Sequence, residues 1–77
     1  MPSNNQLESL LLRIGDKLCK LRHQKNEKMD MVAKAIGVSH SVISQIENGK
    51  YQSLGFDLLY RIAHHYDVSL DELLSPL

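Results

Sequence analysis

Hydrophobic residues recur along the chain at alternating spacings of three and four, which is the period of a helix with one buried face. The first run consists of Leu7, Leu11, Ile14, Leu18 and Leu21. It predicts a helix from about Gln6 to Lys25. Asn26 suits the C-terminal end of this helix, because asparagine adopts the left-handed backbone conformation more readily than most residues.

Two shorter helices follow, joined by a tight turn. The spacing of apolar residues predicts one helix from about Lys28 to Ile36 and another from His40 to about Glu47. Gly37 interrupts the pattern between them, since glycine adopts a positive φ without steric cost. Ser39 is a good N-cap for the later helix, whose end is marked by Asn48-Gly49.

The last third of the chain predicts two more helices. One runs from about Gly55 to Tyr66, and the residues expected on or near its buried face are Phe56, Leu59, Tyr60, Ile62 and Ala63. Ser69 and Glu72 then have the spacing of a capping box at the start of a short final helix. Strand-like alternation is absent from the sequence, so the expected fold class is all-α with five helices.

Composition limits the number of domains and the cellular location that the chain can have. A chain of 77 residues, 43% of them hydrophobic, predicts a single domain over 1–77, in which residues 1–13 extend the first helix toward the N-terminus. Cys19 is the single cysteine, which excludes an intrachain disulfide and favours a reducing, cytoplasmic location. The polar N-terminus does not look like a signal peptide, and no apolar run is long enough for a membrane span.

The charge is unevenly distributed although the net charge is zero. Residues 1–50 carry eight Lys and Arg against five Asp and Glu, and residues 51–77 carry one against four, so the halves are +3 and −3. This asymmetry permits one face to meet phosphates while another meets solvent or a second subunit. The alternative is an accidental distribution in a short chain.

The segment 29–48 carries the functional signal. Ala33 is small where the two short helices would come closest, and Gly37 allows the turn between them. Ile43 and Ile46, three residues apart, would anchor the later helix to the core and leave its opposite face free. These features predict a helix-turn-helix, in which the second helix enters a major groove of DNA.

The chain resembles the Cro/cI-type (XRE-type) helix-turn-helix family of transcriptional regulators over about residues 14–74. The matching stretches are Ile14 to Leu18, Leu21-Arg22, Ala33 to Ser39, Ile43 to Lys50, Ile62-Ala63 and Val68 to Leu74. The resemblance implies a five-helix, phage-repressor-like fold that binds double-stranded DNA sequence-specifically as a homodimer on a palindromic operator. It implies a repressor without cofactor or enzymatic step.

The resemblance also assigns roles to individual residues. The base-reading candidates are His40, Ser41, Ser44 and Gln45. Gln45 can pair with adenine N6 and N7, and His40 can donate to guanine or to a phosphate. The candidates for contacts to the DNA backbone are Lys28, Ser39, Asn48, Lys50 and Tyr51. Such contacts fix the register on DNA and carry no sequence information directly.

Two further expectations follow from comparison with the family pattern. Arg22 and Glu47 match a structural ion pair between the first helix and the end of the third. Met29 departs from the pattern, because many members have a glutamine that contacts phosphate at this position, and Lys28 replaces the usual threonine cap. The second helix is therefore expected to lack a side-chain N-cap.

Other functions have little support. His64 and His65 point about 100° apart on a helix, which argues against a metal site, and no group of residues has the pattern of a catalytic site.

Eight leucines near the two ends of the chain can form a dimer surface or cover the base of the core. They are Leu7, Leu10, Leu11, Leu12, Leu70, Leu73, Leu74 and Leu77. The dimer is the preferred interpretation. The alternative function is a protein-interaction module, such as the antitoxin of a toxin-antitoxin pair, with the acidic C-terminal half as its contact surface.

Overall fold

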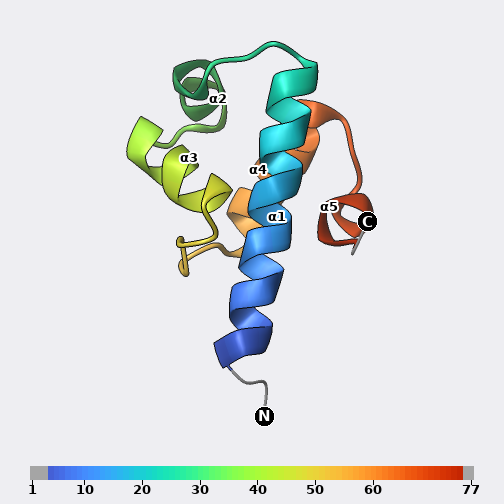
Figure 1. The fold of residues 1–77 in the computed structure, drawn as a ribbon. Helices are drawn as coiled ribbons and strands as arrows, with labels where there is room; N and C mark the ends of the chain where they lie inside the picture. The colour runs from blue at the N-terminus through green and yellow to red at the C-terminus, as the bar shows by residue number, and fades with distance from the viewer. Residues whose placement is uncertain (1–3, 76–77) are drawn as a thin grey trace.

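The computed structural model describes residues 4–75, with side chains from Gln6 onward. Its helices are α1 (Asn4–Gln24), α2 (Met29–Ile36), α3 (His40–Glu47), α4 (Phe56–Tyr66) and α5 (Leu70–Leu74), as Figure 1 shows. The described residues contain no strand, and the all-α, five-helix prediction is confirmed. The expected bounds of the third helix are those observed.

Helices α2 and α4 end at Ile36 and Tyr66 as expected, whereas their starts and both ends of α1 differ from the predictions by one or two residues. Helix α1 begins at Asn4, two residues before the expected start, and ends at Gln24. Lys28 and Gly55 were expected inside α2 and α4, but their backbones are extended and they are the N-cap residues of those helices. A cap residue has non-helical φ and ψ although it adjoins the first turn, so spacing alone cannot separate the two.

The hydrophobic core lies where α1 crosses the other helices. Figure 1 shows α2 and α3 on one side of α1 and α5 on the other, and α1 packs against both α3 and α5. The buried cluster contains Ile14, Leu18, Val32, Ala33, Ile36, Ile43, Ile46, Leu59, Ile62, Ala63, Tyr66 and Leu73. Every helix contributes to it, so the position of α3 is set by the same core that holds the fold together.

Two aromatic residues of α4 were predicted on or near the buried face, and this prediction is wrong. Phe56 is 78% exposed and Tyr60 is 59% exposed. At 100° per residue, the buried residues of α4 centre on one direction, and Phe56 lies roughly 70° and Tyr60 roughly 110° away from it. The Tyr60 ring instead stacks on His64, with ring centroids 5.8 Å apart.

The leucines of the proposed dimer surface have different environments. Leu11 and Leu73 are buried within the chain itself, whereas Leu7 and Leu12 are exposed. Leu10, Leu70 and Leu74 are partly buried against the core. Residues 1–3 of the N-terminal extension and Leu77 lie outside the described residues. Within the described part of the chain, no helix has the length and apolar character needed to cross a membrane.

Candidate nucleic-acid interface

The connection between α2 and α3 is a tight turn built on Gly37. Gly37 has φ 80°, in the left-handed region that glycine adopts without steric cost, as expected. Its N–H and that of Val38 both donate to the carbonyl oxygen of Ala33, each at 2.9 Å. Ala33 is buried at the same place. The small side chain of Ala33 and the left-handed Gly37 together allow α3 to start at His40, three residues after Gly37.

Helix α3 has one buried face and one open face. Ile43 and Ile46 are buried in the core. The four base-reading candidates occupy the other side, where His40, Ser41 and Gln45 are exposed and Ser44 is partly buried. Because these four side chains come from the first turn and a half of one helix, they form a single narrow surface, which we call the α3 outer face.

Hydrogen bonds organise the α3 outer face. The Ser39 hydroxyl accepts from the Val42 N–H at 3.2 Å, so the predicted N-cap is present. The Gln45 amide nitrogen donates to the Ser41 hydroxyl at 3.2 Å. His40 Nδ1 lies 2.5 Å from the carboxylate Oδ1 of Asp30 in the first turn of α2. Sequence reasoning missed this last contact, because it depends on how the turn brings two helix starts together.

The candidates for DNA backbone contacts lie around this face. Asn48, the C-cap of α3, donates from its side-chain amide to the Ser44 carbonyl oxygen at 2.8 Å. Lys50 is exposed in the loop that follows, and Tyr51 is partly buried against the core. Lys28 is exposed at the N-terminus of α2 and makes no side-chain cap, as the departure at this position predicted.

The C-terminal end of α3 is tied to α1 by a buried ion pair. Arg22 Nε lies 2.6 Å from Glu47 Oε2, and Nη2 lies 3.0 Å from Oε1, which is a bidentate geometry. The side chains are only 11% and 6% exposed. Arg22 Nη1 also donates to the Glu27 carbonyl oxygen at 2.9 Å. The hydrogen-bonded Glu47 carboxylate raises the pKa of the Arg22 guanidinium, so the guanidinium stays charged.

Two close approaches of α1 to this region were not recognised in the sequence. A Cβ at Gly15 would lie 2.2 Å from the Ile46 carbonyl oxygen, so only glycine fits where α1 meets the end of α3. A Cβ at Gly49, where φ is 70°, would lie 2.6 Å from Leu12 Cδ2. The available signal was a glycine placed within the apolar run of a long helix, which costs helix stability unless packing requires it.

Cys19 lies beside the ion pair and is not suited to nucleophilic chemistry. Burial raises the pKa of the Cys19 thiol, and the neighbouring Glu47 carboxylate raises it further. The thiol is therefore protonated at neutral pH, whereas a thiolate is the nucleophilic form.

The histidines of α4 are not arranged as a metal site. His65 Nε2 lies 3.0 Å from the Glu27 carboxylate. Among the side chains described, no group of three or more histidines, cysteines and acids is placed to hold a metal ion.

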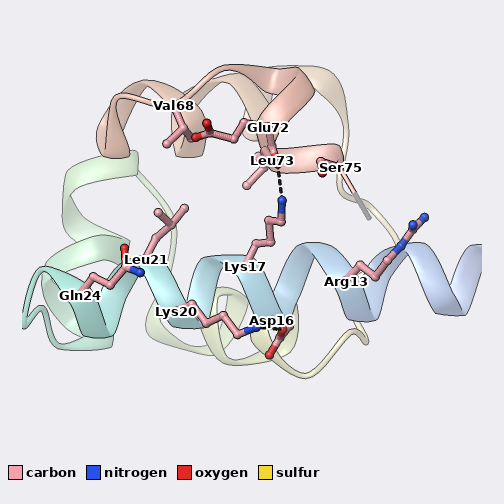
Figure 2. Close-up of a pocket in the computed structure, with 10 residues that line it drawn as sticks. All are labelled: Arg13, Asp16, Lys17, Lys20, Leu21, Gln24, Val68, Glu72, Leu73 and Ser75. Carbon is pink, nitrogen blue, oxygen red and sulfur yellow. Dashed lines mark hydrogen bonds and ion pairs between the residues drawn. The ribbon is translucent and has the colours of Figure 1, made fainter. Parts of the chain in front are cut away.

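A groove on the other side of α1 is separate from this surface. It has a volume of about 480 Å³, and its apolar lining includes Leu21, Val68 and Leu73. Figure 2 shows Lys17 reaching across it from α1, where its amino group donates to the Glu72 carbonyl oxygen of α5 at 2.5 Å. This contact fixes α5 to α1 on the side away from α3.

The fold and the α3 outer face define a helix-turn-helix protein. The profile of a family described as Helix-turn-helix matches residues 20–73, which is more than half of the chain. The chain therefore belongs to the XRE-type helix-turn-helix family, whose members are DNA-binding transcriptional regulators and not enzymes.

A solved structure has the same fold. It is the crystal structure of the restriction-modification controller protein C.AhdI from Aeromonas hydrophila, which matches with a TM-score of 0.75 and 24% sequence identity. The match covers 82% of this chain and 94% of that protein. A comparison with curated protein sequences found no match.

Proposed function

We propose that this chain is a cytoplasmic, sequence-specific repressor, a single domain over 1–77 that binds a near-palindromic operator as a homodimer. The observation that carries the proposal is the contrast between the two faces of α3. Ile43 and Ile46 are buried, while the polar side chains of the α3 outer face are open to a partner. A helix with this contrast fits the major groove, where its N-terminal residues contact base edges.

Gln45 is the proposed main base contact. Its side chain is exposed and already bonded to Ser41, so it lies along the α3 outer face and does not fold back onto the core. On DNA, the amide can exchange the bond to Ser41 for a bidentate pair with adenine N6 and N7. Such a pair discriminates against other bases by about 1–3 kcal/mol.

The α3 outer face carries no lysine or arginine, so charge-based affinity is assigned to its surroundings. Lys28 and Lys50 are exposed at the N-terminus of α2 and in the loop after α3. Ser39, Asn48 and Tyr51 add hydroxyl and amide groups that can bond phosphate oxygens. The Leu12 side chain lies against Gly49, in the middle of the Asn48–Lys50 segment.

The proposed homodimer uses the leucines that the chain leaves open. Leu7 and Leu12 are exposed on α1, and Leu70 and Leu74 are partly buried on α5. A two-fold dimer would place two reading helices about 34 Å apart, on successive major grooves. Light scattering across a concentration series tests this, and a monomer at every concentration would remove the dimer from the proposal.

The function is tested by selecting binding sites from random double-stranded DNA. A repressor of this kind enriches a motif with dyad symmetry, and a template with that motif across a promoter gives less transcript when protein is added. Gln45→Ala should weaken binding to the selected site by about 1–3 kcal/mol and relax one position of the motif. Gln24→Ala, an exposed glutamine at the end of α1, is the matched control and should change neither.

Lys50→Ala tests the backbone contacts in the same assay. It should weaken binding to all sequences alike and lower the slope of log affinity against log salt by about one. Lys20→Ala, in which the lost lysine was paired with Asp16 on α1, should leave the slope unchanged. Absence of any enriched motif at low salt, together with recovery of a protein partner, would replace this proposal by the protein-interaction alternative.

A further inference from the structure

The contact between Asp30 and His40 joins the starts of α2 and α3 at the edge of the α3 outer face. His40 is the first residue of α3, and its Nδ1 lies 2.5 Å from Asp30 Oδ1. Both side chains are open to solvent, His40 at 57% and Asp30 at 79% exposure. The contact therefore lies where a DNA partner would arrive.

When the His40 ring is neutral, the contact determines the hydrogen-bonding role of its outer nitrogen, Nε2. An ionised carboxylate only accepts hydrogen bonds, so Nδ1 must carry the proton that joins the two side chains. A neutral imidazole has one N–H and one lone pair, and Nε2 then carries the lone pair. Without Asp30, either nitrogen of the ring is free to hold the proton.

We propose that Asp30 is a positioning residue that sets base specificity by making His40 Nε2 a hydrogen-bond acceptor. This inference rests on the proposed function and specifies the chemistry of one of its base contacts. In the major groove, the hydrogen-bond donors are the exocyclic amines, N6 of adenine and N4 of cytosine. Neutral His40 therefore reads one of these amines, and not the guanine acceptors to which a donating histidine would bind.

The charge of Asp30 supports a role in specificity over a role in affinity. A carboxylate beside a DNA-binding surface is repelled by phosphates, so it lowers the affinity for every sequence. An exposed contact between two side chains also contributes little to folding. Loss of Asp30 should therefore raise non-specific binding slightly while it removes a base preference, a combination that a purely structural residue would not produce.

The first test measures the tautomer in the free protein. Long-range ¹H–¹⁵N spectra recorded at pH 8.5 distinguish the two tautomers of a neutral imidazole. His40 is assigned by its loss in His40→Ala, since the chain has four histidines. We expect the Nδ1–H tautomer in the native chain and a shift toward Nε2–H in Asp30→Ala. A native His40 protonated on Nε2 alone would overturn the proposal.

The second test uses nucleobase analogues at the base pair whose preference is lost in His40→Ala. Removing the exocyclic amine there should weaken native binding roughly fivefold to tenfold, whereas a 7-deazapurine, which lacks the N7 acceptor, should change it less than twofold. In Asp30→Ala the amine effect should disappear. In a His40→Ala background, Asp30→Ala should not alter base preference.

The possible failures are distinguishable. If the proposed function is wrong, no dyad motif is enriched and the native chain binds all sequences alike. If only this inference is wrong, the dyad motif remains, but the 7-deazapurine weakens native binding or the amine effect persists in Asp30→Ala. Thermal unfolding of Asp30→Ala, expected within a few degrees of the native chain, shows that the variant is folded.

Discussion

The two ends of α3 are held in different ways. The C-terminal end is fixed by a buried bidentate pair, Arg22 with Glu47, and by direct contact of its backbone with Gly15 of α1. The N-terminal end is organised by exposed hydrogen bonds, such as the contact of His40 with Asp30. Buried pairs are costly to break, whereas exposed ones contribute little to stability.

This difference separates stability from recognition within an eight-residue helix. The contacts at the C-terminal end hold α3 against α1, so substitutions in these contacts should act on folding. The N-terminal end and the outward-facing Gln45 carry exposed side chains whose loss should have little effect on folding, so substitutions there should act on DNA binding. A helix-turn-helix protein built in this way can change its target sequence without losing its fold.

The largest expected effect is at the buried pair. Arg22→Met keeps most of the side-chain volume but leaves the Glu47 carboxylate buried without its partner. The free energy of unfolding should fall by about 3 kcal/mol, the lower end of the range for such pairs, because the hydrogen bonds of this pair are only partly buried. Urea denaturation followed by circular dichroism measures this loss.

The double variant Arg22→Met/Glu47→Leu distinguishes an unpaired charge from lost packing. Because both charges are removed, the double variant should be more stable than Arg22→Met alone and close in stability to the native chain. A double variant as unstable as the single one would mean that packing of the Arg22 stem, and not the ion pair, holds the C-terminal end of α3.

Much of this comparison was predictable from the sequence. The bounds of α3 and the Ser39 cap followed from local spacing and turn chemistry, which depend on residues close together in the chain. The pairing of Arg22 with Glu47 followed from the family pattern and has the expected geometry. Such features depend on short motifs, so they can be predicted in any sequence that contains the same motifs.

The rest depended on how helices approach each other. Apolar spacing shows that α4 has a buried face but does not fix its centre, which is why Phe56 and Tyr60 were misplaced. The need for Gly15 depends on the distance between two backbones that the sequence does not encode locally. The contact of Asp30 with His40 likewise depends on the exact course of the turn between α2 and α3.

Gly15→Ala should have the second-largest effect. The new Cβ would meet the backbone carbonyls of Ile46 and Glu47, which cannot move aside as a flexible side chain would. We expect a loss of about 1–3 kcal/mol in the free energy of unfolding, although alanine is the better helix former. Gly55→Ala, where a Cβ meets nothing within 4 Å, is the control for steric overlap and should cost only the smaller difference between glycine and alanine as the N-cap of α4. Equal stability of Gly15→Ala and the native chain would show that α1 and α3 can separate freely.

The smallest effect on folding is expected at the N-terminal end of α3, in Ser39→Ala. The Val42 N–H loses its acceptor, which should lower the free energy of unfolding by about 1 kcal/mol. The first turn then frays, and the side chains of His40 and Ser41 are no longer held on one surface. The loss in binding free energy for the selected DNA should therefore exceed the loss in the free energy of unfolding. Ser39→Asn restores a capping oxygen without adding charge, so it should recover stability. It should also recover most of the affinity, because the asparagine amide can replace the proposed bond of the Ser39 hydroxyl to a phosphate. Should Ser39→Asn recover stability but not affinity, the Ser39 hydroxyl itself contacts DNA, and the N-terminal end of α3 recognises its target through the cap as well as through the side chains that the cap positions.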